Sequence, residues 1–527
     1  MSRVFIFIIL LAITSLAHSQ LREDKSVYIG EAISVINIEL SSSPGPAGHT
    51  MKDLNRDDSE KDTFVPVVSV SFKSDSYPGK SFAGEMKVRG QSTRAGSRKS
   101  FKITLPKGAE KFLGQRKIHL NRHPYDLTRV RNKLSFDLLK TLPNMTSLKT
   151  NFIHLKIDGE DYGFYTQVEH TSKGWLKSRG LDKEGHLYKA ERFRFKREVD
   201  KIKLKSDPTY RVEDFEVALE IKGSDDHAPL IEMLDAVNNK GNSFEAVFKK
   251  HFDEDNYLEW FATTILFGNA DTSSQNFYIY SPQASSKWYF LPWDFDAAWD
   301  FYGQPDQLKN KMAPWHFALG NWGNVRLHKR FFETKGFVSR LVKKIEELKV
   351  DYLGQAKIRA LLDSYKPVVF SEVKRKSELE HLPTIGSTDG QKLKEFEGEF
   401  NRLENVVEKN YKRFMNNVEK PMPVWMDEPE KKSGKKLSFS WEDSFDPQGD
   451  PVTYTVQVSS GPLFRKSDLV YEARAIKDHK HISTKRIRGK NLFFRVLSVD
   501  DKGNFEVPFD DYWDKKADKV LWGLKKL

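Results

Sequence analysis

The chain of 527 residues contains no cysteine. This absence excludes disulfide frameworks, thiolate zinc sites, iron–sulfur clusters and cysteine nucleophiles. Any chemistry must therefore use oxygen and nitrogen groups. After the first twenty residues the chain also has no apolar run that approaches the roughly 20 residues needed to span a bilayer. We therefore expect a mature protein without a transmembrane anchor.

Common signatures of catalysis and nucleotide binding are missing too. The sequence has no His-Glu-x-x-His, no Gly-x-Ser-x-Gly and no Gly-x-Gly-x-x-Gly before a helix. Gly79-Lys80-Ser81 does not complete a phosphate loop, because Ser74 occupies the position of the first glycine. Signatures of nucleic-acid modules are also absent, so we predict no nucleic-acid partner.

The charge balance is mildly basic, with 86 Lys and Arg against 74 Asp and Glu and a net charge of +12. The surplus is spread along the chain, which is more typical of solubility than of binding to an anionic polymer. With 38% hydrophobic residues, the composition predicts a soluble globular protein of several domains.

The first twenty residues are typical of an export signal. Arg3 precedes the apolar run from Val4 to Ile13, and Ala17-His18-Ser19 offers small residues before a cleavage point at Gln20. We predict that residues 1–19 are a cleavable signal peptide and that the protein is exported to the periplasm, the cell surface or the medium. An uncleaved membrane anchor is the alternative, although the run is short for a span.

Hydrophobic patterning predicts an α+β region followed by an all-β region. In the first half, strands bounded by Pro or Gly favour an antiparallel meander, and Asp158-Gly159 is a hairpin turn signal. The second half is dominated by helical periodicity. The expected strands are 27–40, 65–72, 81–88, 99–105, 152–157, 163–169, 277–280 and 287–291, and the expected helical segments are 127–142, 257–267 and 336–419.

The C-terminal hundred residues differ from the rest. Residues 421–436 are rich in Pro, Lys and Glu, which predicts an interdomain linker. Beyond it, alternating strands at 437–441, 452–458 and 491–499 indicate a small β-sandwich over residues 437–527.

Three polar residues flank the predicted hairpin of strands 277–280 and 287–291. Asp271 lies in the loop after a helix, Asn276 opens the first strand, and Asp294 follows the second. The hairpin brings its two ends together, so these side chains converge. Hard oxygen ligands for magnesium and a carboxylate near an attacking hydroxyl are what phosphoryl transfer requires. Surface turns and a salt-bridged core carboxylate are the alternative interpretation.

The N-terminal half supplies cations for the same chemistry. Arg89 and Ser92 flank Gly90 at a turn between two strands, where backbone amides could approach phosphate. Lys99 and Lys102 lie on opposite faces of the next strand, so one of them points into a cleft. Glu169, at the end of a hairpin, is the candidate partner for a buried lysine. The alternative is an exposed basic hairpin.

Taken together, these motifs resemble the CotH family of spore-coat protein kinases over about residues 27–420. The resemblance rests on the order and spacing of Arg89-Gly90-x-Ser92, Lys99-Ser100-Phe101-Lys102, Arg131-Asn132-Lys133-Leu134, Asp158-Gly159-x4-Gly163-x-Tyr165-x3-Glu169, Gly268-Asn269-x-Asp271-x4-Asn276 and Trp293-Asp294-Phe295-Asp296. It implies an atypical protein-kinase-like fold that uses ATP with Mg²⁺ or Mn²⁺ to phosphorylate Ser or Thr of secreted, envelope or coat proteins.

The resemblance also implies roles for individual residues. Asp271 would be the catalytic-loop aspartate. Asn276 and Asp294 would be metal ligands, with Asp296 assisting a second metal. Lys99 would hold the phosphates and pair with Glu169, with Lys102 as the reserve for Lys99. Arg89 and Ser92 would line the nucleotide pocket.

The last domain resembles a fibronectin type III domain. The pattern comprises Ser440-Trp441, Asp446-Pro447-x-Gly449-Asp450-x-Val452-x-Tyr454, Phe494-Arg495-Val496 and Asp500-x-x-Gly503-Asn504. The resemblance implies attachment or spacing, with no part in catalysis.

Two other functions compete with the kinase. A non-catalytic envelope or adhesion scaffold would retain the fold without activity, and export away from ATP favours it. A glycosidase would use Asp294 and Asp296, but neighbours two apart on a strand lie side by side, whereas glycoside cleavage needs carboxyl groups on opposite sides of the bond.

Overall fold

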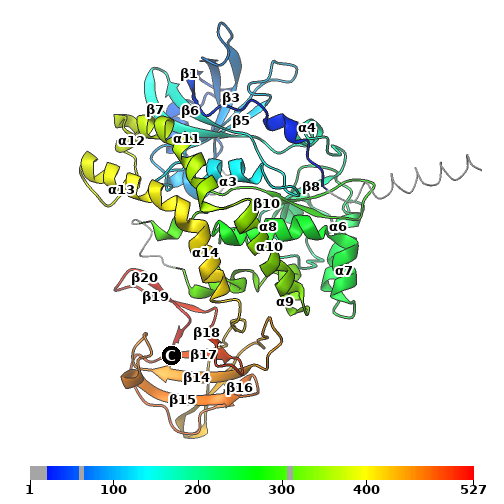
Figure 1. The fold of residues 1–527 in the computed structure, drawn as a ribbon, viewed down its shortest axis with the longest axis vertical. Helices are drawn as coiled ribbons and strands as arrows, with labels where there is room; N and C mark the ends of the chain where they lie inside the picture. Colours follow the sequence, from blue (N-terminus) through cyan, green and yellow to red (C-terminus); the bar gives the residue numbers. More distant parts are fainter. Residues whose placement is uncertain (1–20, 59–63, 305–311) are drawn as a thin grey trace, which may run out of the picture.

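The computed structural model describes residues 21–58, 64–304 and 312–527, and the expected signal peptide, residues 1–19, lies outside them. In this described part, no helix combines the length and apolarity needed to cross a membrane. Three regions follow one another along the long axis of the molecule (Figure 1). They are a β-rich region, here called the barrel lobe, then a helical lobe, and then a C-terminal β domain.

The barrel lobe is a closed barrel in the strand order β1-β2-β3-β4-β5-β7-β6. The barrel closes through a parallel pairing of β1 with β6, and all its other pairings are antiparallel. Side chains that alternate along each strand fill its interior, among them Met86, Phe101 and Leu155, each fully buried. The strands are β1 (Val35–Ser43), β2 (Val68–Ser74), β3 (Phe82–Arg89), β4 (Ser100–Thr104), β5 (Lys117–Asn121), β6 (Thr150–Ile157) and β7 (Glu160–Val168).

Most of the expected strands of this lobe are confirmed. Asp158 and Gly159, with φ values of 52° and 82°, form the tight turn between β6 and β7. The expectation for residues 27–40 was partly wrong, because Lys25–Tyr28 is a 3₁₀ turn and the strand begins at Val35. The polar stretch after β1 contains a short helix, α2 (Met51–Arg56). Strand β5 was not expected.

The helical lobe surrounds a four-stranded sheet in the order β11-β10-β8-β9. Its apolar core is continuous with helix α3, which lies under the barrel. Its strands are β8 (His186–Ala190), β9 (Leu219–Ile221), β10 (Phe277–Ser281) and β11 (Tyr289–Pro292). Its helices are α3 (Arg131–Leu139), α4 (Lys173–Ser178), α5 (Val212–Glu216), α6 (Ala228–Asn238), α7 (Phe244–His251), α8 (Glu254–Leu266), α9 (Arg326–Glu333), α10 (Phe337–Asp351), α11 (Gln355–Val373), α12 (Lys376–Leu379), α13 (Asp389–Arg402) and α14 (Val406–Met415).

Helix α8 is the central element of this lobe. The Asp253 side chain caps it by accepting from the backbone N–H of Asn256. All but its first two residues are buried, and Trp260 packs on Phe290 of β11 with ring centroids 4.4 Å apart. The helix ends before Gly268, whose φ of 62° turns the chain toward β10. A buried, well-packed helix therefore fixes the position of the loop that contains Asp271.

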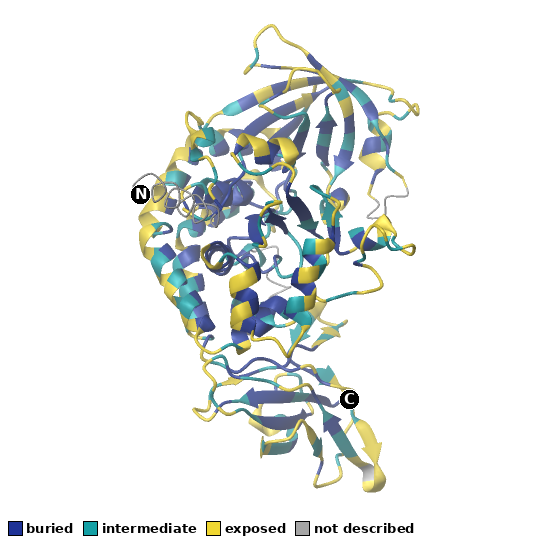
Figure 2. Ribbon diagram, turned by 90° about the vertical axis from the view of Figure 1, so that its right-hand side faces the viewer, coloured by how far each residue is buried: buried dark blue, intermediate teal, exposed yellow. Residues whose placement is uncertain are grey.

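The C-terminal β domain contains a three-stranded sheet, β12-β13-β16, and a larger sheet in the order β15-β14-β17-β18 with β21 beside β17. Both sheets contribute to one core, which includes Phe439 and Phe494. Figure 2 shows this as a band of buried residues separate from the main core. The strands are β12 (Glu430–Lys432), β13 (Lys436–Ser440), β14 (Thr453–Ser459), β15 (Leu469–Ile476), β16 (Lys480–Ile482), β17 (Phe493–Val499), β18 (Phe505–Glu506), β19 (Asp511–Asp514), β20 (Lys519–Trp522) and β21 (Lys525–Lys526). The fibronectin type III assignment stays a prediction.

The segment expected as a linker, residues 421–436, is instead packed into this domain. Val424 and Met426 belong to its core, and Glu430–Lys432 is strand β12. The composition of the segment indicated a connector because three of its charged residues, Glu430–Lys432, form the exposed strand β12. The domain also contacts the helical lobe, where Trp315 packs against Phe509 with ring centroids 5.0 Å apart. The two regions therefore share an apolar interface.

Candidate active site

A cavity of about 450 Å³ lies between the barrel lobe and the sheet of the helical lobe. The barrel contributes the ends of β3, β4 and β5, and the helical lobe contributes β8, β9 and the loops around β10 and β11. The sequence places acidic residues on the helical side and many of the cations on the barrel side. The predicted site residues that line this cavity are Arg89, Ser92, Lys102, Asp271, Asn276, Asp294 and Asp296.

Asp271 and Asn276 are held together by the loop that follows α8. Asn276 Nδ2 donates to Asp271 Oδ2 at 2.7 Å, and Gln275 Nε2 donates to Asp271 Oδ1 at 3.1 Å. The φ of Asn276 is 63°, a left-handed conformation that asparagine tolerates better than most residues. Because the amide nitrogen of Asn276 is engaged by Asp271, its Oδ1 is the atom available to a ligand.

The hairpin of β10 and β11 brings the second acidic segment to the same place, as predicted. Phe277 pairs with Pro292, so Asn276 and Asp294 lie at the same end of the hairpin. Helix α3 fixes the segment, because Asn132 Oδ1 accepts the backbone N–H of Phe295 at 3.1 Å. The Phe295 ring packs against Phe136 of α3 at 5.7 Å. A backbone hydrogen bond and a ring contact therefore anchor the segment around Asp294 to α3.

The acidic residues carry raised pKa values. Burial, with a smaller contribution from the charge of Asp296, raises the pKa of Asp271 to about 6. The same two causes raise the pKa of Asp294 to about 7, although Arg89 opposes the shift. The raised pKa values mean that burial and the neighbouring Asp296 charge outweigh the positive groups around these two carboxylates. A bound cation would correct this.

The barrel side of the cavity is basic. Burial, together with Lys117, Lys87 and Lys222, lowers the pKa of Lys102 to about 8. Burial also lowers the pKa of Arg89, while Asp294 and Asp296 act in the opposite direction. Lysines that lower the pKa of one another are favourable places for a polyanion, whose charge would remove the repulsion.

Gly90 shapes the loop above these cations. Its φ is 92°, and a Cβ atom would lie 2.0 Å from Thr93 Oγ1, so only glycine fits. The loop continues into a 3₁₀ turn, Ser92–Ala95, and Ser92 lines the cavity. The tight turn allows the backbone of the loop to approach a ligand in the cavity.

The predicted pair of Lys99 and Glu169 is wrong. Lys99 Nζ donates to the carbonyl of Arg94, and Lys99 does not line the cavity. Glu169 is instead bound by the guanidinium of Arg179, with one contact at 3.1 Å, and by Gln115 Nε2 at 3.1 Å. Lys99 precedes β4 and turns away, so the lysine that faces the cavity is the reserve candidate, Lys102.

Several residues that line the cavity were not predicted as site residues. His119, His123, His154 and His170 share no ligand spacing in the sequence, which is typical of ordinary polar or core residues. His119, His123 and His170 line the cavity together with Asn121. His119 Nδ1, Asn121 Oδ1, His123 Nε2 and His170 Nδ1 are buried without a hydrogen-bond partner within the described residues. His119 and Asn121 occupy alternate positions of β5, so recognition of that strand could have placed both on one face. His154 lies elsewhere, with Nδ1 2.7 Å from Glu372.

A second cavity of about 310 Å³ adjoins the first. Both are lined by Asp271, Asp296 and His123, and the second also by Tyr125 and Tyr302. His123 Nδ1 is 3.6 Å from Asp296 Oδ2. Asp271 therefore stands where the two cavities meet and can contact ligands from both sides.

The donor set fits a hard divalent cation. Carboxylate and amide oxygens of Asp294, Asn276 and Asp296 are the ligand type that Mg²⁺ and Mn²⁺ prefer. Among the described residues, the carboxylate oxygens of Asp271, Asp294 and Asp296 do not form a group in which all three lie within 4.8 Å of one another. Such spacing suits an ion that takes one or two protein carboxylates and completes its shell with water and phosphate.

Comparison with known proteins shows the family of the chain. Residues 86–414 match the family model described as "CotH kinase protein". The "Inner spore coat protein H" of Bacillus subtilis (strain 168) is 26% identical over 307 residues, and the match covers 56% of this chain and 81% of that protein. The crystal structure of a Helicobacter pylori proinflammatory kinase, CtkA, aligns with 60% of this chain and 94% of its own at 12% identity, but its TM-score of 0.28 does not establish a shared fold. The family match covers more than half of the sequence, and this chain belongs to the CotH kinase protein family.

Proposed function

We propose that the chain is an exported protein kinase that transfers phosphate from ATP to Ser or Thr of envelope or coat proteins. Membership of the CotH kinase family and similarity to an inner spore coat protein support this proposal. The observation that carries it is the position of Asp271 between two cavities, one of which is lined by cations and carboxylates. A nucleotide in the first and an acceptor in the second would meet at this carboxylate.

The basic side of the first cavity would bind the polyphosphate. Lys102 and Arg89 supply charge, and Ser92 lies in the loop that Gly90 shapes. The lowered pKa of Lys102, about 8, rises again when an anion binds beside it. The phosphate chain thereby offsets the repulsion among the lysines, so binding selects a ligand with several negative charges.

Asp294 and Asn276, with help from Asp296, would hold Mg²⁺ or Mn²⁺. Such an ion would supply neutralisation of charge on the transferring phosphoryl group. The chain's own contribution is to keep these oxygens aimed into the cavity, through the Phe295 backbone contact with Asn132. Asn276 is aimed by its hydrogen bond to Asp271.

Asp271 would accept the proton of the attacking hydroxyl. With a pKa of about 6 before a cation binds, Asp271 is ionised at neutral pH and can accept a proton. The second cavity, lined by Tyr125 and Tyr302, leaves room for a Ser or Thr side chain to approach Asp271. In this proposal the nucleotide and the acceptor would approach different sides of the Asp271 carboxylate.

Transfer of radiolabelled phosphate from ATP tests the proposal, with the full mature chain, Mg²⁺ or Mn²⁺, and a Ser-rich acceptor. Wild type and the exposed control Asp443→Asn should incorporate label, and Asp294→Asn should not. Absence of label in wild type, combined with absence of metal-dependent ATP binding, would contradict the proposal and favour a scaffold.

Export has its own test. N-terminal sequencing of the protein recovered outside the cytoplasm should begin near Gln20. Retention of residues 1–19 in that material would contradict the predicted cleavage.

A further inference from the structure

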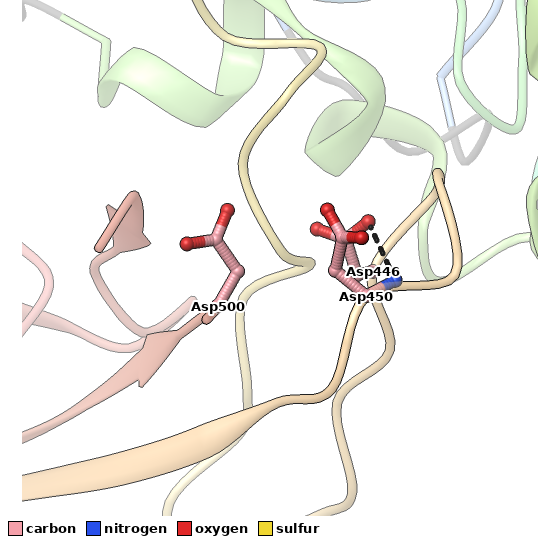
Figure 3. A group of neighbouring side chains, drawn as sticks. All are labelled: Asp446, Asp450 and Asp500. Carbon is pink, nitrogen blue, oxygen red and sulfur yellow. Dashed lines mark hydrogen bonds between the residues drawn. The ribbon is translucent and has the colours of Figure 1, made fainter. Parts of the chain in front are cut away.

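A second group of aspartates lies outside the candidate active site, in the C-terminal β domain. Asp446 and Asp450 belong to the loop before β14, and Asp500 follows β17 (Figure 3). Each offers a carboxylate oxygen, and these oxygens all lie within 4.8 Å of one another. When oxygen ligands surround a calcium ion at about 2.4 Å, two oxygens on opposite sides of the ion are about 4.8 Å apart. The three carboxylates therefore lie close enough together to coordinate one calcium ion.

The burial of two of these carboxylates is the second observation. Asp446 is 6% exposed and Asp500 is 5% exposed. Within the described residues, neither has a basic side chain within the 4 Å of an ion pair. Asp446 Oδ1 accepts the backbone N–H of Gln448 at 2.8 Å, but Asp446 Oδ2 is buried and has no hydrogen-bond partner in the same described part. A cation would stabilise a buried carboxylate oxygen that has no donor and belongs to a group of three carboxylates.

The charge count leads to a divalent ion. Among the described residues, the basic side chain paired with the group is Lys502, whose Nζ is 2.6 Å from Asp450 Oδ2 and whose side chain is 54% exposed. Three carboxylates and one ammonium leave two negative charges. The other contacts of Asp500 come from neutral donors, namely the backbone N–H groups of Lys502 and Asn504 and the Asn504 amide.

We propose that Asp446, Asp450 and Asp500 bind a calcium ion. Calcium fits better than zinc, which favours nitrogen and sulfur ligands. It also fits better than magnesium, which needs shorter, strictly octahedral contacts and retains more water. Carbonyl oxygens of the loop and water would complete the six to eight ligands that calcium takes. This site is independent of the proposed kinase activity.

The position of the site indicates what calcium would do. The chain passes from the helical lobe into the β domain at residues 418–422. Residues that neighbour the three aspartates form hydrogen bonds with this segment. Gln448 Nε2 donates to the Val418 carbonyl at 2.9 Å. Ser498 Oγ donates to the Met422 carbonyl at 2.8 Å, and the Met422 N–H donates to the Phe445 carbonyl at 2.9 Å. A calcium ion that joins the loop before β14 to the end of β17 would therefore stiffen the junction between the regions.

Calcium titration of the chelator-treated full chain tests the site. We expect one calcium bound per mature chain, with a Kd of about 10⁻³ M or tighter, as for extracellular calcium modules. We expect calcium to raise the melting temperature and to slow cleavage of the junction by protease, both more than magnesium does. Asp446→Asn and Asp500→Asn should lose the response, whereas Asp443→Asn, which changes an exposed aspartate of the same loop region, should keep it.

Asp294→Asn separates this site from the active site. That variant should keep the full calcium response, so failure of the proposed kinase activity would leave this result unchanged. A wild-type chain whose melting temperature and proteolysis do not respond to calcium would overturn the proposal, even where the variants fail to fold. An unchanged response in folded Asp446→Asn would overturn it as well.

Discussion

The chain carries two groups of three aspartates, and their surroundings differ. Asp271, Asp294 and Asp296 are spread around an open cavity whose opposite wall is basic. Asp446, Asp450 and Asp500 are within 4.8 Å of one another and have one ammonium nearby. The first arrangement suits an ion that arrives with a polyanion, and the second suits a bare cation. The spacing of carboxylates and the charge opposite them therefore distinguish two kinds of metal site.

The largest effect is expected at Asp271. If it accepts the proton of the acceptor hydroxyl, Asp271→Asn should lower the rate of phosphoryl transfer by about 10²–10⁴-fold, the usual contribution of a general base. Metal-dependent nucleotide binding should change little, which calorimetry can verify. A variant that transfers phosphate at the wild-type rate would remove Asp271 from the chemistry.

The basic wall is tested by two lysines three positions apart. Lys102→Met should weaken nucleotide binding by about 10–100-fold, because a charge-assisted hydrogen bond contributes about 1.5–3 kcal/mol. Lys99→Met is the matched control, since Lys99 is buried against the Arg94 carbonyl. It should lower the free energy of unfolding with a smaller effect on binding. A larger loss of nucleotide binding in Lys99→Met than in Lys102→Met would identify Lys99 as the phosphate ligand.

The raised pKa of Asp294 predicts a pH-dependent stability difference. Its folded pKa is about 7, above the ordinary value of 3.8, so the folded state binds the proton more tightly between those values. Without metal, the wild-type free energy of unfolding should fall from about pH 4 to pH 7 relative to Asp294→Asn, by about 1–3 kcal/mol. Denaturant titrations at pH 4, 6 and 8 measure it. A difference that does not depend on pH would contradict the shift.

The smallest effect is expected from calcium removal. At about ten times its Kd, calcium should stabilise the folded chain by about 1.4 kcal/mol, from the mass-action relation for one site. A chelator should therefore lower the melting temperature of wild type by a few degrees and leave Asp500→Asn unchanged. Equal shifts in both chains would place the calcium elsewhere.

Local patterns predicted the acidic wall well. The alternating strands 277–280 and 287–291 implied a hairpin, and a hairpin fixes which residues meet at its open end. Asn276 and Asp294 consequently meet without any information on the rest of the fold. The Asp158-Gly159 turn was equally determined by its two residues, which both adopt positive φ.

The basic wall depended on contacts that sequence patterns do not contain. Whether Lys99 or Lys102 faces the cavity is decided by where β4 begins, and strand ends are the least certain part of a pattern. Glu169 was assigned to a lysine because its partner in the structure, Arg179, directly follows helix α4, and the sequence around Glu169 does not reveal this contact. The short strand β5, between Gly114 and Pro124, was not recognised, so His119 and Asn121 were not placed in the cavity.

The most direct test of the difference between the two aspartate groups is calorimetry on the full mature chain and its variants. Each chain is titrated with Mn²⁺ plus ATP and, separately, with Ca²⁺ alone. We expect Asp294→Asn to lose Mn²⁺-dependent ATP binding and keep calcium binding, and Asp446→Asn to do the opposite. A variant that loses both ligands, or neither, would contradict the account of two separate sites with different ligands.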